Sequence, residues 1–158
     1  MTSDTSRPET PATRAAATLD LPHEVRVIER ARSAAEAAER LGIPARQLLK
    51  TLVVRRAEGD LLLVLVPGPA QIDWPKLRAH LGVSRLSMPD AEVARDATGY
   101  ERGTITPLGA RGAWPVLADA SIVGSGTVSI GGGAHGVAIL ADADELIAAL
   151  QVEVVDLT

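Results

Sequence analysis

Two neighbouring runs of β-forming residues constrain the fold of this chain more than any other feature. Residues 51–56 (TLVVRR) and 61–67 (LLLVLVP) are separated only by AEGD, a spacing and composition typical of a β-hairpin. The second run is apolar on every side, so both faces of that strand should be buried against other parts of the protein. We therefore predict a buried central strand, with other strands beside it and helices packed on it.

Capping residues mark where the helices begin and end. Ser33 is followed three residues later by Glu36, which is the pattern of a capping box, and Gly42 suits the end of that helix. Pro44 can open a short helix over PARQLLK, which would place Lys50 at its end. Three aspartates are expected to cap the later helices: Asp73, Asp90 and Asp142.

The remaining strands complete a mixed fold. They are expected at residues 23–29, 114–120, 127–130 and 136–140, and the final VEVVDL can add an edge strand. Helices and strands are mixed but do not alternate strictly, which predicts an α/β or α+β domain with a mixed sheet. A length of 158 residues favours a single domain, and the absence of Phe predicts an aliphatic core.

The first 18 residues differ from the rest in composition. They are rich in Thr, Ser, Pro and Ala without an apolar period, so we predict a disordered tail over residues 1–18 and a folded domain over residues 19–158. The chain has no cysteine, which excludes disulfides and thiolate chemistry. No apolar run is long enough to span a membrane, and no signal-peptide pattern is present. A cytoplasmic location is the default expectation.

The charge of the chain limits what it can bind. A formal net charge of −4 argues against broad, non-specific binding of nucleic acid. Arg46, Lys50, Arg55 and Arg56 lie close together in the sequence, so a local basic face and an ordinary solvated surface both remain open.

Two glycine-rich segments stand out, at residues 98–109 (TGYERGTITPLG) and 131–136 (GGGAHG). The second matches G-x-G-x-x-G, but strand-like VAIL follows it where a dinucleotide site needs a helix. It is either a hairpin turn with positive φ angles or a place where a ligand approaches bare backbone. If the two segments converge, they form a pocket whose peptide N–H groups can stabilise developing charge.

Other catalytic patterns are missing. The three histidines, His23, His80 and His135, have no metal-ligand spacing, and neither G-x-S-x-G nor a phosphate-binding P-loop occurs. Lys50 stands just before TLVV, where it either complements a helix C-terminus or performs a function.

Three blocks together resemble a known family: LLKTLVV (48–54), TGYERGTITPLG (98–109) and IGGGAHGVAI (130–139). In order and spacing they are similar to YbaK-type aminoacyl-tRNA deacylases, which are related to the editing domain of bacterial prolyl-tRNA synthetases. The resemblance implies a mixed, partly barrel-like sheet with packed helices. It also implies hydrolysis of the ester between a wrong amino acid and the 3′ end of tRNA, without a cofactor or a metal.

The resemblance assigns roles to individual residues. It makes Lys50 the catalytic residue, which meets the aminoacylated 3′ end of the tRNA. The expected substrate-binding residues lie in the two glycine-rich segments and are Tyr100, Gly103, Thr106, Pro107, Gly109, Gly131, Gly132 and Gly133. The implied partner is aminoacyl-tRNA, and an aminoacyl-tRNA synthetase is a second candidate partner.

Two departures from the family bear on the substrate. Members that remove cysteine from the proline tRNA have an Asp where this chain has Ala138, and a small hydroxyl residue where it has Gly131. The expected function is a free-standing trans-editing deacylase for a small amino acid, of the cysteine or alanine type, on the proline tRNA. The alternative is a non-catalytic module of the same fold that binds aminoacyl-tRNA or a synthetase.

Overall fold

The predicted hairpin forms the middle of a four-stranded sheet. In the computed structural model, which describes residues 8–158, β2 (Leu49–Ala57) pairs antiparallel with β3 (Asp60–Pro67). On its other side β3 pairs in parallel with β4 (Val116–Asp119), and β4 pairs in parallel with β7 (Glu153–Val155). Every residue from Leu61 to Val66 is buried, as expected for a strand that is apolar on both faces.

A second sheet contains three antiparallel strands in the order β1 (Glu24–Val27), β6 (Val137–Asp142) and β5 (Thr127–Gly131). A single parallel bridge between Leu48 and Ser129 joins it to the first sheet. The mixed α/β fold in one domain is therefore confirmed. Within the described residues the strands form two sheets and do not close into a barrel.

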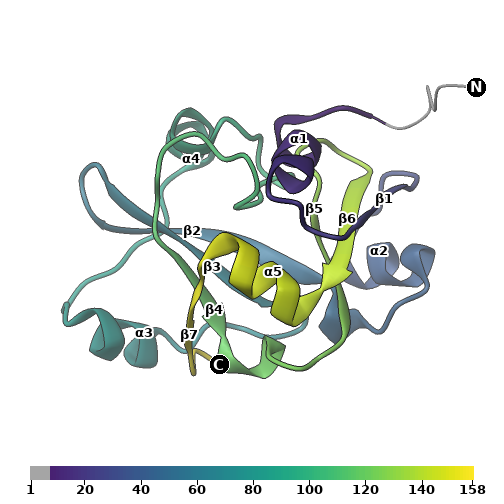
Figure 1. The fold of residues 1–158 in the computed structure, drawn as a ribbon. Coiled ribbons are helices and arrows are strands. Elements are labelled where there is room, and N and C mark those ends of the chain that lie inside the picture. Colours follow the sequence, from purple (N-terminus) through teal and green to yellow (C-terminus); the bar gives the residue numbers. More distant parts are fainter. Residues whose placement is uncertain (1–7) are drawn as a thin grey trace, which may run out of the picture.

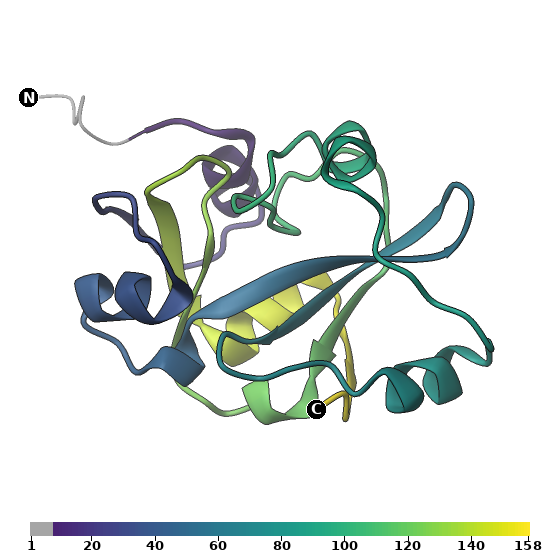
Figure 2. The same cartoon turned by 180° about the vertical axis from the view of Figure 1, so that it is seen from behind.

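The predicted caps are present at four helices. They begin after Ser33, Asp73, Asp90 and Asp142, whose side chains each accept a hydrogen bond from the backbone three residues later. The helices are α2 (Ala34–Leu41), α3 (Trp74–Leu81), α4 (Ala91–Thr98) and α5 (Ala143–Leu150). Figures 1 and 2 show α5 across one side of the sheets, with α2 and α3 at opposite ends of the molecule.

The prediction of a disordered tail needs correction over Pro11–Thr18, which form a further helix, α1. Thr10 caps this helix, and Ala12 and Ala16 are completely buried. Alanines four residues apart lie on one helix face, and their small side chains let the helix pack closely without a bulky apolar pattern in the sequence. The packed part of the chain thus begins before residue 19. Residues 1–7 lie outside the described part.

The segment before Lys50 also differs from expectation. The short helix predicted over PARQLLK is a 3₁₀ turn of three residues, Ala45–Gln47. Pairing of β2 with β3 begins at Leu49, so Lys50 is the second residue of a strand, opposite Val66. Sheet pairing outweighs the local helix signal here, and Lys50 has no helix end to complement.

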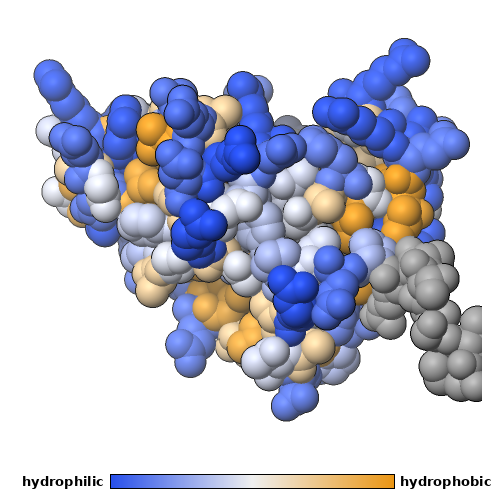
Figure 3. Space-filling model, turned by 90° about the horizontal axis from the view of Figure 1, so that it is seen from above, coloured by the Kyte–Doolittle hydropathy of each residue, from blue (hydrophilic) through white to orange (hydrophobic). Residues whose placement is uncertain are grey.

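None of the described helices is long and apolar enough to cross a membrane. Seen from above, the side chains that project from the surface are hydrophilic, and the apolar residues lie in separate clusters between them (Figure 3).

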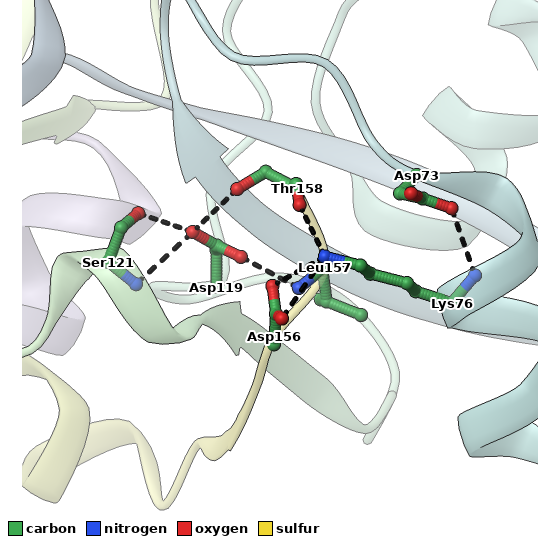
Figure 4. Close-up of polar contacts among 7 residues, drawn as sticks. All are labelled: Asp73, Lys76, Asp119, Ser121, Asp156, Leu157 and Thr158. Carbon is green, nitrogen blue, oxygen red and sulfur yellow. Dashed lines mark hydrogen bonds and ion pairs between the residues drawn. The ribbon is translucent and has the colours of Figure 1, made fainter.

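Asp119, at the end of β4, fastens the C-terminal residues to the first sheet (Figure 4). This buried carboxylate accepts hydrogen bonds from the backbone N–H of Leu157 at 2.8 Å and of Ser121 at 3.2 Å. It also accepts bonds from the hydroxyl groups of Ser121 and Thr158. Burial by itself raises the pKa of Asp119, but these hydrogen bonds outweigh burial and lower the pKa below its ordinary value.

Replacing Asp119 with Ala is expected to lower the free energy of unfolding by about 3 kcal/mol, because buried donors lose a charged acceptor. The pKa of Asp119 is lower in the folded than in the unfolded protein. Its contribution to the free energy of unfolding is therefore present above the unfolded pKa of about 3.9 and is lost as the pH falls through the folded pKa. Urea unfolding at pH 7 and in steps below about pH 4 measures both effects. Asp119→Asn is the control. The prediction would be contradicted if the free energy of unfolding of this variant fell with decreasing pH as steeply as that of the unmodified protein.

Candidate active site

The two glycine-rich segments meet at a pocket of about 820 Å³. We call residues 99–109 the first loop and residues 131–136 the second loop. The pocket lies between these loops, α2, β2 and the beginning of α4. Most of its wall is apolar, and small side chains such as Ala34, Ala94 and Ala138 leave the space open.

Close contacts between the two loops confirm that they converge. A Cβ atom placed on Gly103 would lie 3.6 Å from Cε1 of His135, and one placed on Gly131 would lie 3.1 Å from the Ile105 carbonyl oxygen. The His135 ring also faces Glu101, with 3.5 Å between Nε2 and a carboxylate oxygen. The first loop therefore rests directly against the second, and Gly103 and Gly131 both line the pocket between them.

Lys50 lines the same pocket from β2 and is half-buried there. Across residues 8–158 its ammonium group takes part in none of the six ion pairs, all of which involve other side chains. A half-buried cation without a carboxylate partner retains its full capacity to bind an anion. Structure and resemblance thus place the same lysine at the pocket.

The mouth of the pocket carries further positive charge. Arg30, Arg32 and Arg102 are exposed and line it. Among the described residues that line this pocket, Asp90 supplies the one carboxylate, and that carboxylate caps α4. The chain as a whole has a net charge of −4, so the positive mouth is a local feature. No pattern in the sequence points to these arginines, which stand outside the basic cluster at residues 46–56.

Six of the expected substrate-binding residues do not line the pocket. Three of them are buried (Tyr100, Thr106 and Gly132), Pro107 and Gly133 are half-buried, and Gly109 is exposed. Tyr100 is buried, and its hydroxyl donates a hydrogen bond of 2.6 Å to the Leu108 carbonyl oxygen. Burial raises the pKa of Tyr100 to about 12, and the positive charge of Arg14 offsets part of this rise. Tyr100 therefore stays protonated at neutral pH and holds the first loop in shape. The buried Thr106 hydroxyl accepts a hydrogen bond from the Leu108 N–H in the same loop.

The remaining three glycines pack against other parts of the chain. A Cβ atom on Gly109 would overlap the backbone of Pro11, and one on Gly132 would overlap Val137. A Cβ atom on Gly133 would lie 2.9 Å from the Tyr100 ring. Of the expected site residues, the structure brings Lys50, Gly103 and Gly131 together at the pocket.

Ser129 is a lining residue that sequence analysis missed. It lies on β5 beside Gly131, is 2% exposed, and pairs with Leu140 of β6. In the sequence, its strand TVSI reads as ordinary alternation, which gives no sign that the serine borders a cavity. No group of three or more His, Asp or Glu side chains within residues 8–158 is placed to hold a metal ion.

Solved structures of the same fold cover nearly the whole chain. A hypothetical protein, APE2540, superposes with a TM-score of 0.86 at 22% identity, over 94% of this chain and 99% of that one. A protein proposed to be a trans-editing enzyme for prolyl tRNA synthetase superposes with a TM-score of 0.84 at 27% identity, over 100% of this chain and 99% of that one. Both of these proteins therefore share the fold of this chain over nearly its whole length.

The chain belongs to the aminoacyl-tRNA editing domain family, whose model matches residues 28–149. Curated relatives include the proline–tRNA ligase of Thermosipho africanus, 35% identical over 79 residues, which are 50% of this chain and 14% of that protein. The proline–tRNA ligase of Moorella thermoacetica is 36% identical over 91 residues, which are 58% of this chain and 16% of that protein. The matched region spans less than a fifth of either ligase.

Proposed function

We propose that this domain is an aminoacyl-tRNA deacylase that acts in trans on a mischarged small amino acid. The observation that carries the proposal is the meeting of Lys50 with Gly103 and Gly131 at one pocket, in a chain of the editing family. Relatedness to proline–tRNA ligases favours the proline tRNA as the substrate. Similarity over the full chain to a protein proposed to edit in trans supports that mode of action.

For this reaction the protein needs mainly to position the substrate and to stabilise charge. An aminoacyl ester is already activated, so water, a ribose hydroxyl or the side chain of the substrate can attack its carbonyl carbon. The positive charge of Lys50 stabilises the oxyanion that develops, or holds the terminal phosphate in place. Backbone next to Gly103 and Gly131 lets the ester approach without steric hindrance. Fixing the reacting groups in this way supplies much of the rate enhancement.

The charge and polarity of the pocket suit the two ends of such a substrate. Arg30, Arg32 and Arg102 at the mouth complement the phosphates of the tRNA 3′ end. The apolar wall around Ala34, Ala94 and Ala138 suits a small uncharged amino acid side chain.

The two departures from cysteine-removing members lie at one place. Gly131 and Ala138 are paired directly across β5 and β6, and both line the pocket. The positions that carry a hydroxyl and a carboxylate in those members are thus adjacent here and carry no polar side-chain atom. A polar contact to a cysteine thiol would be missing at this point.

We expect the proline tRNA charged with alanine or with serine to be hydrolysed at least as fast as the same tRNA charged with cysteine. The three rates should lie within ~10-fold of one another, because the amino acids differ little in size. Initial rates of hydrolysis of these three substrates and of prolyl-tRNA test both the proposed deacylase activity and the preference among small amino acids. Ala138→Leu should slow every substrate by filling the pocket, whereas Ala79→Leu, at an exposed position on α3, should not. A preference of more than ~100-fold for cysteinyl-tRNA would contradict the size argument, and no hydrolysis of any substrate would contradict the proposed function.

A further inference from the structure

The N-terminus of α1 lies against the second loop, behind the pocket. The Thr10 hydroxyl donates a buried hydrogen bond of 2.6 Å to the Gly132 carbonyl oxygen, across 122 positions of the sequence. The same hydroxyl accepts a bond from the Thr13 N–H at 3.1 Å, which caps the helix. Thr10 is only 7% exposed, so one side chain fixes both the helix start and a loop peptide.

The first loop is held by the same segment. Gly109 lies so close to Pro11 that no Cβ atom fits between them. A Cβ atom on Gly133 would lie 3.3 Å from the Thr10 hydroxyl oxygen and 3.4 Å from the Ala12 side chain. The helix start therefore contacts both loops, and Figures 1 and 2 show α1 beside the connection from β5 to β6.

The bond to Thr10 fixes the direction of a backbone donor. The Gly132 N–H donates to the Val137 carbonyl oxygen at 2.9 Å, and the Gly132 carbonyl accepts from Thr10. In a planar trans peptide the next N–H, that of Gly133, points opposite to this carbonyl. The Thr10 bond thus sets the orientation of the Gly132–Gly133 peptide, while the bond to Val137 holds the preceding peptide, which begins at Gly131 in the pocket lining.

We propose that Thr10 is a positioning residue, which holds the second loop in the arrangement that the pocket requires. The proposal rests on the proposed function for its effect on rate. Thr10 does not line the pocket and acts through Gly132. A shift of the second loop by about 1 Å would move Gly131 relative to Lys50 and to the first loop, and such shifts are costly to catalysis.

The experiment compares Thr10→Val, which removes the hydroxyl at nearly constant shape, with Thr10→Ser, which keeps the hydroxyl. Thr13→Ala is the matched control, because Thr13 bonds only to Thr10 at the helix start and not to the loop. The substrate is the proline tRNA charged with alanine. We expect Thr10→Val to lower kcat about 10-fold with KM changed less than about 3-fold, while Thr10→Ser and Thr13→Ala keep nearly normal rates. Unchanged kcat in Thr10→Val, or an equal loss in Thr13→Ala, would overturn the proposal.

Amide hydrogen exchange supplies a readout that does not depend on activity. Thr10→Val should speed exchange of the amides in residues 132–137 by about 10-fold or more through local opening, and Thr13→Ala should leave these amides unchanged. Unchanged exchange in Thr10→Val would overturn the proposed role of Thr10 even if the unmodified protein is active. If the unmodified protein hydrolyses no substrate, the proposed function fails, and the exchange rates still decide whether Thr10 holds the loop.

Discussion

Lys50→Met is expected to slow deacylation by about 10²–10³-fold, the usual cost of losing one preorganised charge-stabilising contact, while the protein stays folded. Methionine keeps most of the apolar stem of lysine and removes the charge. Lys50 is half-buried at the pocket, belongs to β2, and takes part in none of the ion pairs of residues 8–158, so its charge contributes little to the fold. The measurement is the single-turnover rate of hydrolysis beside a thermal melt.

The other lysine of the chain is a matched control. Lys76 lies on α3, where its ammonium bonds to both carboxylate oxygens of Asp156 at 3.1 Å (Figure 4). Lys76→Met should therefore cost a little stability and no activity. Lys50→Arg should also be impaired, because a planar guanidinium does not replace a compact ammonium group. A nearly normal rate in Lys50→Met would remove Lys50 from the mechanism.

Gly103→Val is expected to lower the deacylation rate about 100-fold, by displacing the first loop from the second. Gly103 has a φ of +89°, which a β-branched residue adopts only under strain, and its Cβ direction leads to His135. The strain should lower the free energy of unfolding by about 1–3 kcal/mol. Hydrolysis rates and urea unfolding curves separate the two effects.

Gly59→Val is the matched control for backbone strain. Gly59 has a φ of +73° between β2 and β3, does not line the pocket, and has open space where a Cβ atom would lie. Its replacement should cost a similar amount of stability and leave the rate unchanged. If Gly103→Val and Gly59→Val lose activity equally, the first loop is a connector and not part of the site.

The elements that the sequence predicted well are those with local signals. The hairpin of β2 and β3 follows from a short polar connection, and Ser33, Asp73, Asp90 and Asp142 each cap a helix as expected. Helix α1 was missed because its buried face consists of Ala12 and Ala16, which leave no apolar period to detect. Its burial depends on loops about 90 or more residues later in the chain, and no local pattern records such a contact.

The candidate site was predicted in part for a similar reason. A glycine in a loop shows that something approaches the backbone closely, but it does not show what does so. At Gly103 and Gly131 the backbone borders the pocket, whereas at Gly109 the close neighbour is Pro11 and at Gly133 it is the Tyr100 ring. Only the folded arrangement separates glycines that face a cavity from glycines that let two segments of the chain pack together.

The most direct test of the central claim is a count of turnovers. The protein is mixed with a 100-fold molar excess of the proline tRNA charged with alanine, and the hydrolysed ester is measured over time. The controls are buffer alone and the Lys50→Met variant. We expect the unmodified protein to release many equivalents of alanine per equivalent of protein, at a rate that Lys50→Met reduces by about 10²–10³-fold. Release that stops at one equivalent, or ester that is protected relative to buffer, would identify a binding module and contradict the proposed deacylase.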